Sequence, residues 1–136
     1  MSASIKILIV EEQDLLREKI AGILSREENI TMVIQIASYS KLRGALEETI
    51  PDILLADFFE FNKFCKENGI FAGDLCPDAN TLLYTDENWR LNPLETGHLG
   101  EQRIFDVRLI QQEVKSYLQA MSPRKHTINN KIKISK

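Results

Sequence analysis

Four residues with oxygen-bearing side chains stand where strand-like segments end. Three are carboxylates, which can hold a hard cation or accept a phosphoryl group, and one is a hydroxyl; they are Glu11, Glu12, Asp57 and Thr85. The apolar segments that precede them are 5–10, 53–56 and 81–84. Closely packed carboxylates raise each other's pKa unless a cation neutralises them, and oxygen ligands with room for water favour Mg²⁺. These residue types therefore indicate a cation or oxyanion site, provided that the fold brings the segment ends together.

The elements that must position these residues alternate between strands and helices. Apolar, β-branched runs predict strands that cover residues 5–10, 31–37, 53–56, 81–84 and 102–105. Apolar residues at helical spacing predict helices that open at Asp14, at Ser38 or Ser40, and after Asp106. We expect Asp14 to cap the first of them. Pro51 and Asp52 end the second helix before the third strand begins.

This rhythm is typical of parallel β-α-β units joined by right-handed crossovers. Strands that are apolar on both faces need helices on both sides of the sheet. We predict a single doubly wound, flavodoxin-like α/β domain with three layers, in which a parallel five-stranded sheet has the order 2-1-3-4-5. Ligands bind such sheets outside the carboxyl ends of the strands. Because the first and third strands are neighbours in this order, Glu11, Glu12 and Asp57 should converge on Mg²⁺, with Thr85 placed to bond an oxyanion.

The chain resembles the receiver domains of bacterial two-component response regulators along most of its length. The segments that carry the resemblance are 5–12, 51–57 and 82–85, with Gly97 and Gly100 before the fifth strand. The resemblance implies a phosphoacceptor at Asp57, metal ligation by Glu11, Glu12 and Asp57, and a phosphoryl-sensing hydroxyl at Thr85. It also implies that the partner is a histidine kinase or a phosphotransfer protein.

The site departs from the receiver pattern in several places. The acidic pair is usually aspartate, and each glutamate here reaches about 1.5 Å further. The segment 58–61, Phe-Phe-Glu-Phe, stands where a Met-Pro is usual. The lysine that usually ends the fifth strand falls at Ile104, Glu101 replaces the switch aromatic, and Arg103 points to the other face by strand alternation.

Composition and charge limit the class of protein. The chain has 136 residues, 43% hydrophobic and 27% charged, which is typical of one soluble domain. The net charge is −3, and residues 122–136 carry +5 without an acid, which leaves −8 for residues 1–121. We predict a receiver domain over 3–121 and a flexible basic tail or linker over 122–136. An acidic body and a tail without aromatic residues indicate no nucleic-acid binding by this chain alone.

Other features favour a cytoplasmic protein. The start of the chain lacks a signal-peptide core, and no apolar run is long enough to span a membrane. Cys65 and Cys76 are too few for a disulfide framework, and their spacing to His98 and His126 matches no zinc motif. Five of the six phenylalanines lie within 58–71, where we expect them to pack in the core and on helix faces; a partner-binding patch is the alternative.

Two functions remain open from the sequence. The first is a receiver domain that takes a phosphoryl group from a histidine kinase onto Asp57, with weakly bound Mg²⁺, and signals through its fourth-helix to fifth-helix face, which could also form a homodimer. The alternative is a pseudo-receiver, an interaction module that works without phosphorylation, which Ile104 and the two glutamates favour. Neither function acts on an external substrate, so we do not expect an enzyme. Residues 11–14 are too acidic to cradle the phosphate of a flavin or nucleotide.

Overall fold

The computed structural model describes residues 4–77, 79–85 and 103–120 of the chain. Five parallel strands form one sheet in the order β2-β1-β3-β4-β5. Their bounds are β1 (Ile5–Val10), β2 (Ile30–Ile36), β3 (Ile53–Asp57), β4 (Asn80–Thr85) and β5 (Arg103–Asp106). The predicted fold class and strand order are confirmed. The fifth strand is shifted by one residue from the predicted range 102–105.

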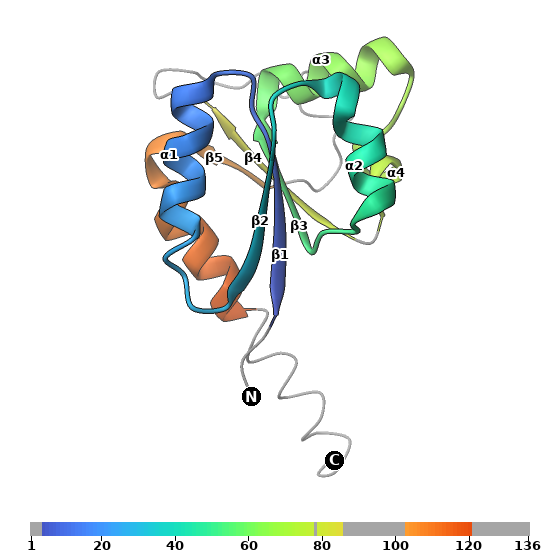
Figure 1. Ribbon diagram of the computed structural model, residues 1–136. Coiled ribbons are helices and arrows are strands. Elements are labelled where there is room, and N and C mark those ends of the chain that lie inside the picture. The colour runs from blue at the N-terminus through green and yellow to red at the C-terminus, as the bar shows by residue number, and fades with distance from the viewer. Residues whose placement is uncertain (1–3, 78, 86–102, 121–136) are drawn as a thin grey trace, which may run out of the picture.

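Helices cover both faces of the sheet (Figure 1). On one face lie α1 (Asp14–Leu24) and the last described helix, residues 110–120, which comes after the short 3₁₀ helix η3 (Val107–Leu109). On the other face lie η1 (Tyr39–Lys41), α2 (Leu42–Glu48), α3 (Phe58–Asn68) and the short α4 (Ala72–Leu75). The three layers therefore result from the alternation of strands and helices. No helix among the described residues is both long and apolar enough to cross a membrane.

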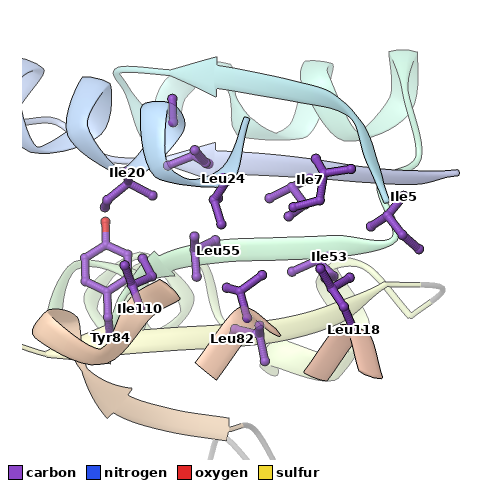
Figure 2. Close-up of a cluster of buried hydrophobic side chains, with 14 of the residues drawn as sticks. Ile5, Ile7, Ile20, Leu24, Ile53, Leu55, Leu82, Tyr84, Ile110 and Leu118 are labelled. Carbon is purple, nitrogen blue, oxygen red and sulfur yellow. The ribbon is translucent and has the colours of Figure 1, made fainter. Parts of the chain in front are cut away.

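Alternation along each strand divides the core into two apolar clusters. In β1, Ile7 and Ile9 pack toward α1 and the last described helix, whereas Leu8 and Val10 pack toward α2 and α3. All four side chains are fully buried. Figure 2 shows the first cluster, with Tyr84 at the end opposite Ile5 and Leu118. Burial on both faces is what fixes the register of a strand, since a slip of one residue would exchange the two sets.

The helix starts are set by short-range hydrogen bonds. Ser38 caps η1 by accepting the backbone N–H of Ser40, so of the two serines proposed to open this segment Ser38 performs the role. The expected cap at Asp14 is wrong, because Gln13 occupies the cap position and Asp14 is the first helical residue. The reason is that the Glu11 carboxylate accepts the Gln13 N–H at 2.9 Å and closes the turn itself, while Asp14 pairs with Arg17 at 2.7 Å.

The phenylalanine-rich segment forms α3, which begins directly after β3. Phe58 and Phe61 are fully buried, and Phe59 and Phe64 pack partly buried against the same cluster, as expected for core and helix-face residues. Phe71 lies beyond the helix and is 65% exposed, so the expectation fails there. Cys65 and Cys76 are buried free thiols.

Several predictions concern parts of the chain outside the described residues. These are the two glycines Gly97 and Gly100, Glu101, the two histidines, the side chain of Arg103 and the basic tail 122–136. The segment between β4 and β5, which would supply the fourth helix of the predicted signalling face, also falls in this part of the chain.

Candidate functional site

The carboxyl ends of three neighbouring strands bring Glu11, Asp57 and Tyr84 together. Val10 of β1 pairs with Ala56 of β3, so the next residues, Glu11 and Asp57, stand side by side at the edge of the sheet. Asp57 in turn pairs with Tyr84 of β4. Glu11 and Asp57 were both predicted as site residues, whereas Tyr84 was not.

Glu11 is a buried carboxylate with both oxygens engaged. Its side chain is only 6% exposed. Oε1 accepts the Tyr84 hydroxyl at 2.5 Å, and Oε2 accepts the backbone N–H of Gln13. Burial and this hydrogen bond to Glu11 raise the pKa of Tyr84 far above the ordinary value of a tyrosine, so the phenol stays protonated. Because a buried carboxylate without donors is costly, the phenol and the Gln13 N–H together make the buried position of Glu11 tolerable.

Asp57 ends β3 and caps α3 at the same time. The backbone runs from the strand directly into the helix, and the carboxylate oxygen Oδ2 accepts the N–H of Glu60 at 3.0 Å. The Asp57 side chain is half-buried. Burial raises its pKa, and Glu11 and Glu60 raise it further, while the N–H groups of Glu60 and Phe59 act in the opposite direction. The charges that act most strongly on this carboxyl group are therefore those of other carboxylates, and its stabilising partners are helix amides.

A second phenol, Tyr39 of η1, comes three residues after the carboxyl end of β2, at the same edge of the sheet. Its ring packs on Phe64 of α3 with a centroid separation of 5.1 Å and an interplanar angle of 33°. Burial raises the pKa of the hydroxyl well above its ordinary value, with further contributions from Asp57 and then from Glu11. The buried hydroxyl oxygen has no hydrogen-bond partner in the described part of the chain. An unpaired buried polar group of this kind costs about 1–3 kcal/mol, so its position needs an explanation.

The other predicted elements of the site lie apart from this group. Thr85 is buried, pairs with Asp106 of β5, and donates to the carbonyl oxygen of Phe105 at a long 3.5 Å. Its role as a phosphoryl-sensing hydroxyl stays a prediction. Ile104, at the position where the resemblance implies a lysine, pairs with Leu83 and packs against the apolar cluster under α2 and α3.

The three predicted Mg²⁺ ligands do not form a ready metal site. No group of three His, Cys, Asp or Glu side chains within the described residues is placed to hold a metal ion. Successive residues at a strand end point to opposite sides, and accordingly Glu11 is buried while Glu12 is exposed. The hydrogen bonds of Glu11 further occupy its carboxylate. Ligation of Mg²⁺ by Glu11, Glu12 and Asp57 stays a prediction, and the placement of the residues does not fit a three-carboxylate centre.

The arrangement offers an acceptor carboxylate and several hydrogen-bond donors. Asp57 is the carboxylate that is both partly exposed and aligned with a helix N-terminus, and an anion added there would meet backbone N–H groups. Sequence analysis missed Tyr84 and Tyr39, which supply the phenols. Tyr84 could have been proposed from the sequence, because it precedes Thr85 at the end of a strand. Tyr39 could not, because its ring contact with Phe64 depends on the packing of η1 against α3.

Comparison with known proteins supports the fold. No protein-family model matches the chain, and no curated protein sequence matches it. Several solved structures, however, match the fold of this chain. The non-phosphorylated receiver domain of the stress response regulator RcsB from Escherichia coli has a TM-score of 0.63 at 15% identity, over 88% of this chain and 94% of that one. The signal receiver domain of NarL from Mycobacterium tuberculosis has a TM-score of 0.58 at 13% identity, over 86% and 98%.

A longer structure shows the same likeness. The RcsB response regulator of Salmonella typhimurium has a TM-score of 0.64 at 14% identity, over 88% of this chain, which spans 62% of that protein. At such identities the comparisons establish the fold alone. The chain has the doubly wound fold that receiver domains of response regulators share, as the sequence predicted.

Proposed function

We propose that the chain is a signal-transduction receiver domain in which Asp57 accepts a phosphoryl group. The observation that carries this proposal is the position of Asp57: a half-buried carboxylate at the carboxyl end of the central strand β3, capping α3. This is the edge at which ligands bind doubly wound sheets. The likeness to receiver domains supports the same assignment.

The proposed phosphoryl transfer makes one bond to Asp57 and breaks one bond to the donor. A carboxylate oxygen of Asp57 attacks the phosphorus of a phosphohistidine or an acyl phosphate, the bond from phosphorus to the leaving group breaks, and a mixed anhydride forms on Asp57. The acyl phosphate carries about −1.5 to −2 charges at the start of α3, where the free carboxylate carries −1. The N–H groups of Phe59 and Glu60, which already act on the Asp57 carboxylate, favour a negative charge at this place.

The donor that fits this chemistry is a histidine kinase or a phosphotransfer protein. Asp57 is the acceptor in that reaction and does not turn over an external substrate, so the proposal does not make the chain an enzyme. A homodimer through the fourth-helix to fifth-helix face also stays a proposal. Mg²⁺ is expected to bind weakly, because Glu11, one of the predicted ligands, is buried with both oxygens hydrogen-bonded, whereas Glu12 is exposed.

A second candidate function is favoured by a specific observation. Asp57 Oδ2 is bound to the Glu60 N–H, and both oxygens of Glu11 are bound to Tyr84 and Gln13. A site whose acidic groups are already engaged in structural hydrogen bonds fits a pseudo-receiver, which binds protein partners without phosphorylation. Ile104, packed against the apolar cluster in place of a lysine, supports this candidate as well.

Intact-mass spectrometry separates the two candidates. The parent chain and Asp57→Asn are incubated with acetyl phosphate in a buffer containing Mg²⁺. We expect the parent to gain the mass of one phosphoryl group and Asp57→Asn to gain none. A parent that gains no mass under conditions that phosphorylate a control receiver would refute the phosphoacceptor and leave the pseudo-receiver. A gain that persists in Asp57→Asn would assign the modification to another residue.

A further inference from the structure

The hydroxyl of Tyr39 is a buried donor whose acceptor must come from outside the described chain. Its oxygen is buried and has no hydrogen-bond partner among the described residues. Tyrosine hydroxyls usually find a partner when buried, since leaving one unpaired is unfavourable. A ligand that supplies an acceptor oxygen at this place would remove the penalty.

The direction of this hydroxyl is set by its packing. The Tyr39 ring rests on Phe64, one helical turn beyond Glu60 on α3. Of the charged groups that raise the pKa of Tyr39, Asp57 acts most strongly, followed by Glu11 and Glu60. Tyr39 also comes three residues after the carboxyl end of β2, so it stands at the same edge of the parallel sheet as Glu11 and Asp57. Because burial raises its pKa, the hydroxyl keeps its proton near neutral pH and can donate a hydrogen bond to an anion.

We propose that Tyr39 is a phosphoryl-binding residue, whose hydroxyl donates a hydrogen bond to a phosphoryl oxygen carried by Asp57. This role rests on the proposed function. The free Asp57 carboxylate directs Oδ2 to the Glu60 N–H, whereas a phosphoryl group extends beyond the carboxylate and adds three further acceptor oxygens. Tyr39 neither gains nor loses its proton in the transfer. It binds the product.

The ligand chemistry that fits is an anion and not a bare cation. A phenol that keeps its proton can donate to a phosphoryl oxygen, whereas Mg²⁺ is usually bound by carboxylates, phosphates and waters. The position that would carry a lysine is taken by Ile104 inside the apolar packing. Within the described residues, we assign the anion on Asp57 to the backbone amides of α3 and the hydroxyl of Tyr39, because the Tyr84 hydroxyl is bound to Glu11 and that of Thr85 to Phe105.

The test compares the full chain with Tyr39→Phe, which keeps the ring on Phe64 and removes only the hydroxyl. Beryllofluoride serves as the phosphoryl analogue, and its dissociation constant is measured by NMR titration in a buffer with Mg²⁺. Hydrogen bonds to charged groups are strong, so the variant should bind the analogue about tenfold more weakly. Its thermal midpoint should equal or exceed that of the parent, because the unpaired buried oxygen is gone.

Tyr117→Phe is the matched control. It also removes one tyrosine hydroxyl, but on the last described helix. Tyr117 lies about 10 Å along this helix from Ile110, the helix residue that Figure 2 shows beside Tyr84. Its affinity for beryllofluoride should equal that of the parent. Acetyl phosphate labelling, read by intact mass, gives a second readout: the parent should reach a higher phosphorylated fraction than Tyr39→Phe at the same acetyl phosphate concentration.

The outcomes separate this inference from the proposed function. If the parent is phosphorylated and Tyr39→Phe binds beryllofluoride equally well, the role of Tyr39 is refuted and that of Asp57 stands. If Tyr39→Phe loses affinity and also melts at a lower temperature, the hydroxyl has a structural partner and the inference is overturned. If the parent neither gains the phosphoryl mass nor binds beryllofluoride, the proposed function is refuted and the role of Tyr39 with it.

Discussion

Removing the hydroxyl of Tyr84 should destabilise the domain. The Tyr84 side chain is 1% exposed and donates to Oε1 of Glu11, which is itself only 6% exposed. Phenylalanine keeps the ring in the apolar cluster under α1, so Tyr84→Phe changes little besides this hydrogen bond. The variant leaves a buried carboxylate that has lost one of its two donors.

The magnitude depends on the charge and burial of the acceptor. A hydrogen bond to a charged group contributes roughly 1.5–3 kcal/mol, and a buried carboxylate that loses its donor falls in the same range. We take about 2 kcal/mol. For a domain of this length, each kcal/mol of lost stability lowers the melting temperature by about 4 °C. The melting temperature of Tyr84→Phe should therefore fall by about 8 °C.

Tyr39→Phe is the natural comparison, because the same atom is removed from a second buried phenol. Urea unfolding and calorimetry on the parent and both variants give the two changes in the free energy of unfolding. We expect Tyr84→Phe to be clearly destabilising and Tyr39→Phe to be neutral or stabilising. Equal losses at both positions would refute the reasoning from hydrogen-bond partners. Glu11→Gln, combined with Tyr84→Phe in a double-mutant cycle, isolates the energy of the pair.

Two further predictions concern Asp57 and Ile104. Burial raises the pKa of Asp57 above its ordinary 3.8, and the charge of Glu11 raises it further. The contribution of Asp57 to the free energy of unfolding is therefore present at low pH and is lost as the pH rises through the pKa of the folded state. Asp57→Asn keeps a capping acceptor and does not titrate, so its stability relative to the parent should increase from acid to neutral pH in urea unfolding; a difference independent of pH would contradict this. Ile104→Lys should enlarge the NMR response to beryllofluoride and lower the free energy of unfolding by about 1–3 kcal/mol, whereas Ile104→Met should do neither. Equal NMR responses in the parent and both variants would show that charge at this position does not matter.

The fold could be predicted from the sequence because its signals are local. The β-branched run 5–10 and the apolar run 53–56 have the length and composition of buried parallel strands, and an amphipathic segment follows the first of them. Asp57 could be predicted for the same reason, since it ends a buried strand. The cap at Asp14 could not, because the residue that closes the turn is Glu11, whose side chain was assigned to metal binding.

The composition of the site depends on distances in space that the sequence does not contain. Tyr84 lies beside Asp57 because of the register of β3 and β4, and sequence analysis chose Thr85, one residue later. Tyr39 reaches the site because η1 and α3, far apart along the chain, pack through Phe64. Likewise, the adjacent glutamates Glu11 and Glu12 look like a metal-binding pair in the sequence, but strand geometry sends one inward and leaves the other exposed.

These placements change where a phosphorylation signal would act. A lysine on β5 would act through its charge, which reaches across several ångströms, whereas a hydroxyl and backbone amides act only at hydrogen-bond distance. Among the residues that the structure describes, the donors that we propose for the phosphoryl group belong to η1 and to the first turn of α3, and the Ile104 side chain of β5 carries no donor. A phosphoryl group on Asp57 would therefore pull on the junction between η1 and α3, where Tyr39 packs on Phe64, before it affected β5. If the proposal holds, the hydroxyl of Tyr39 would thus determine which face of the domain responds.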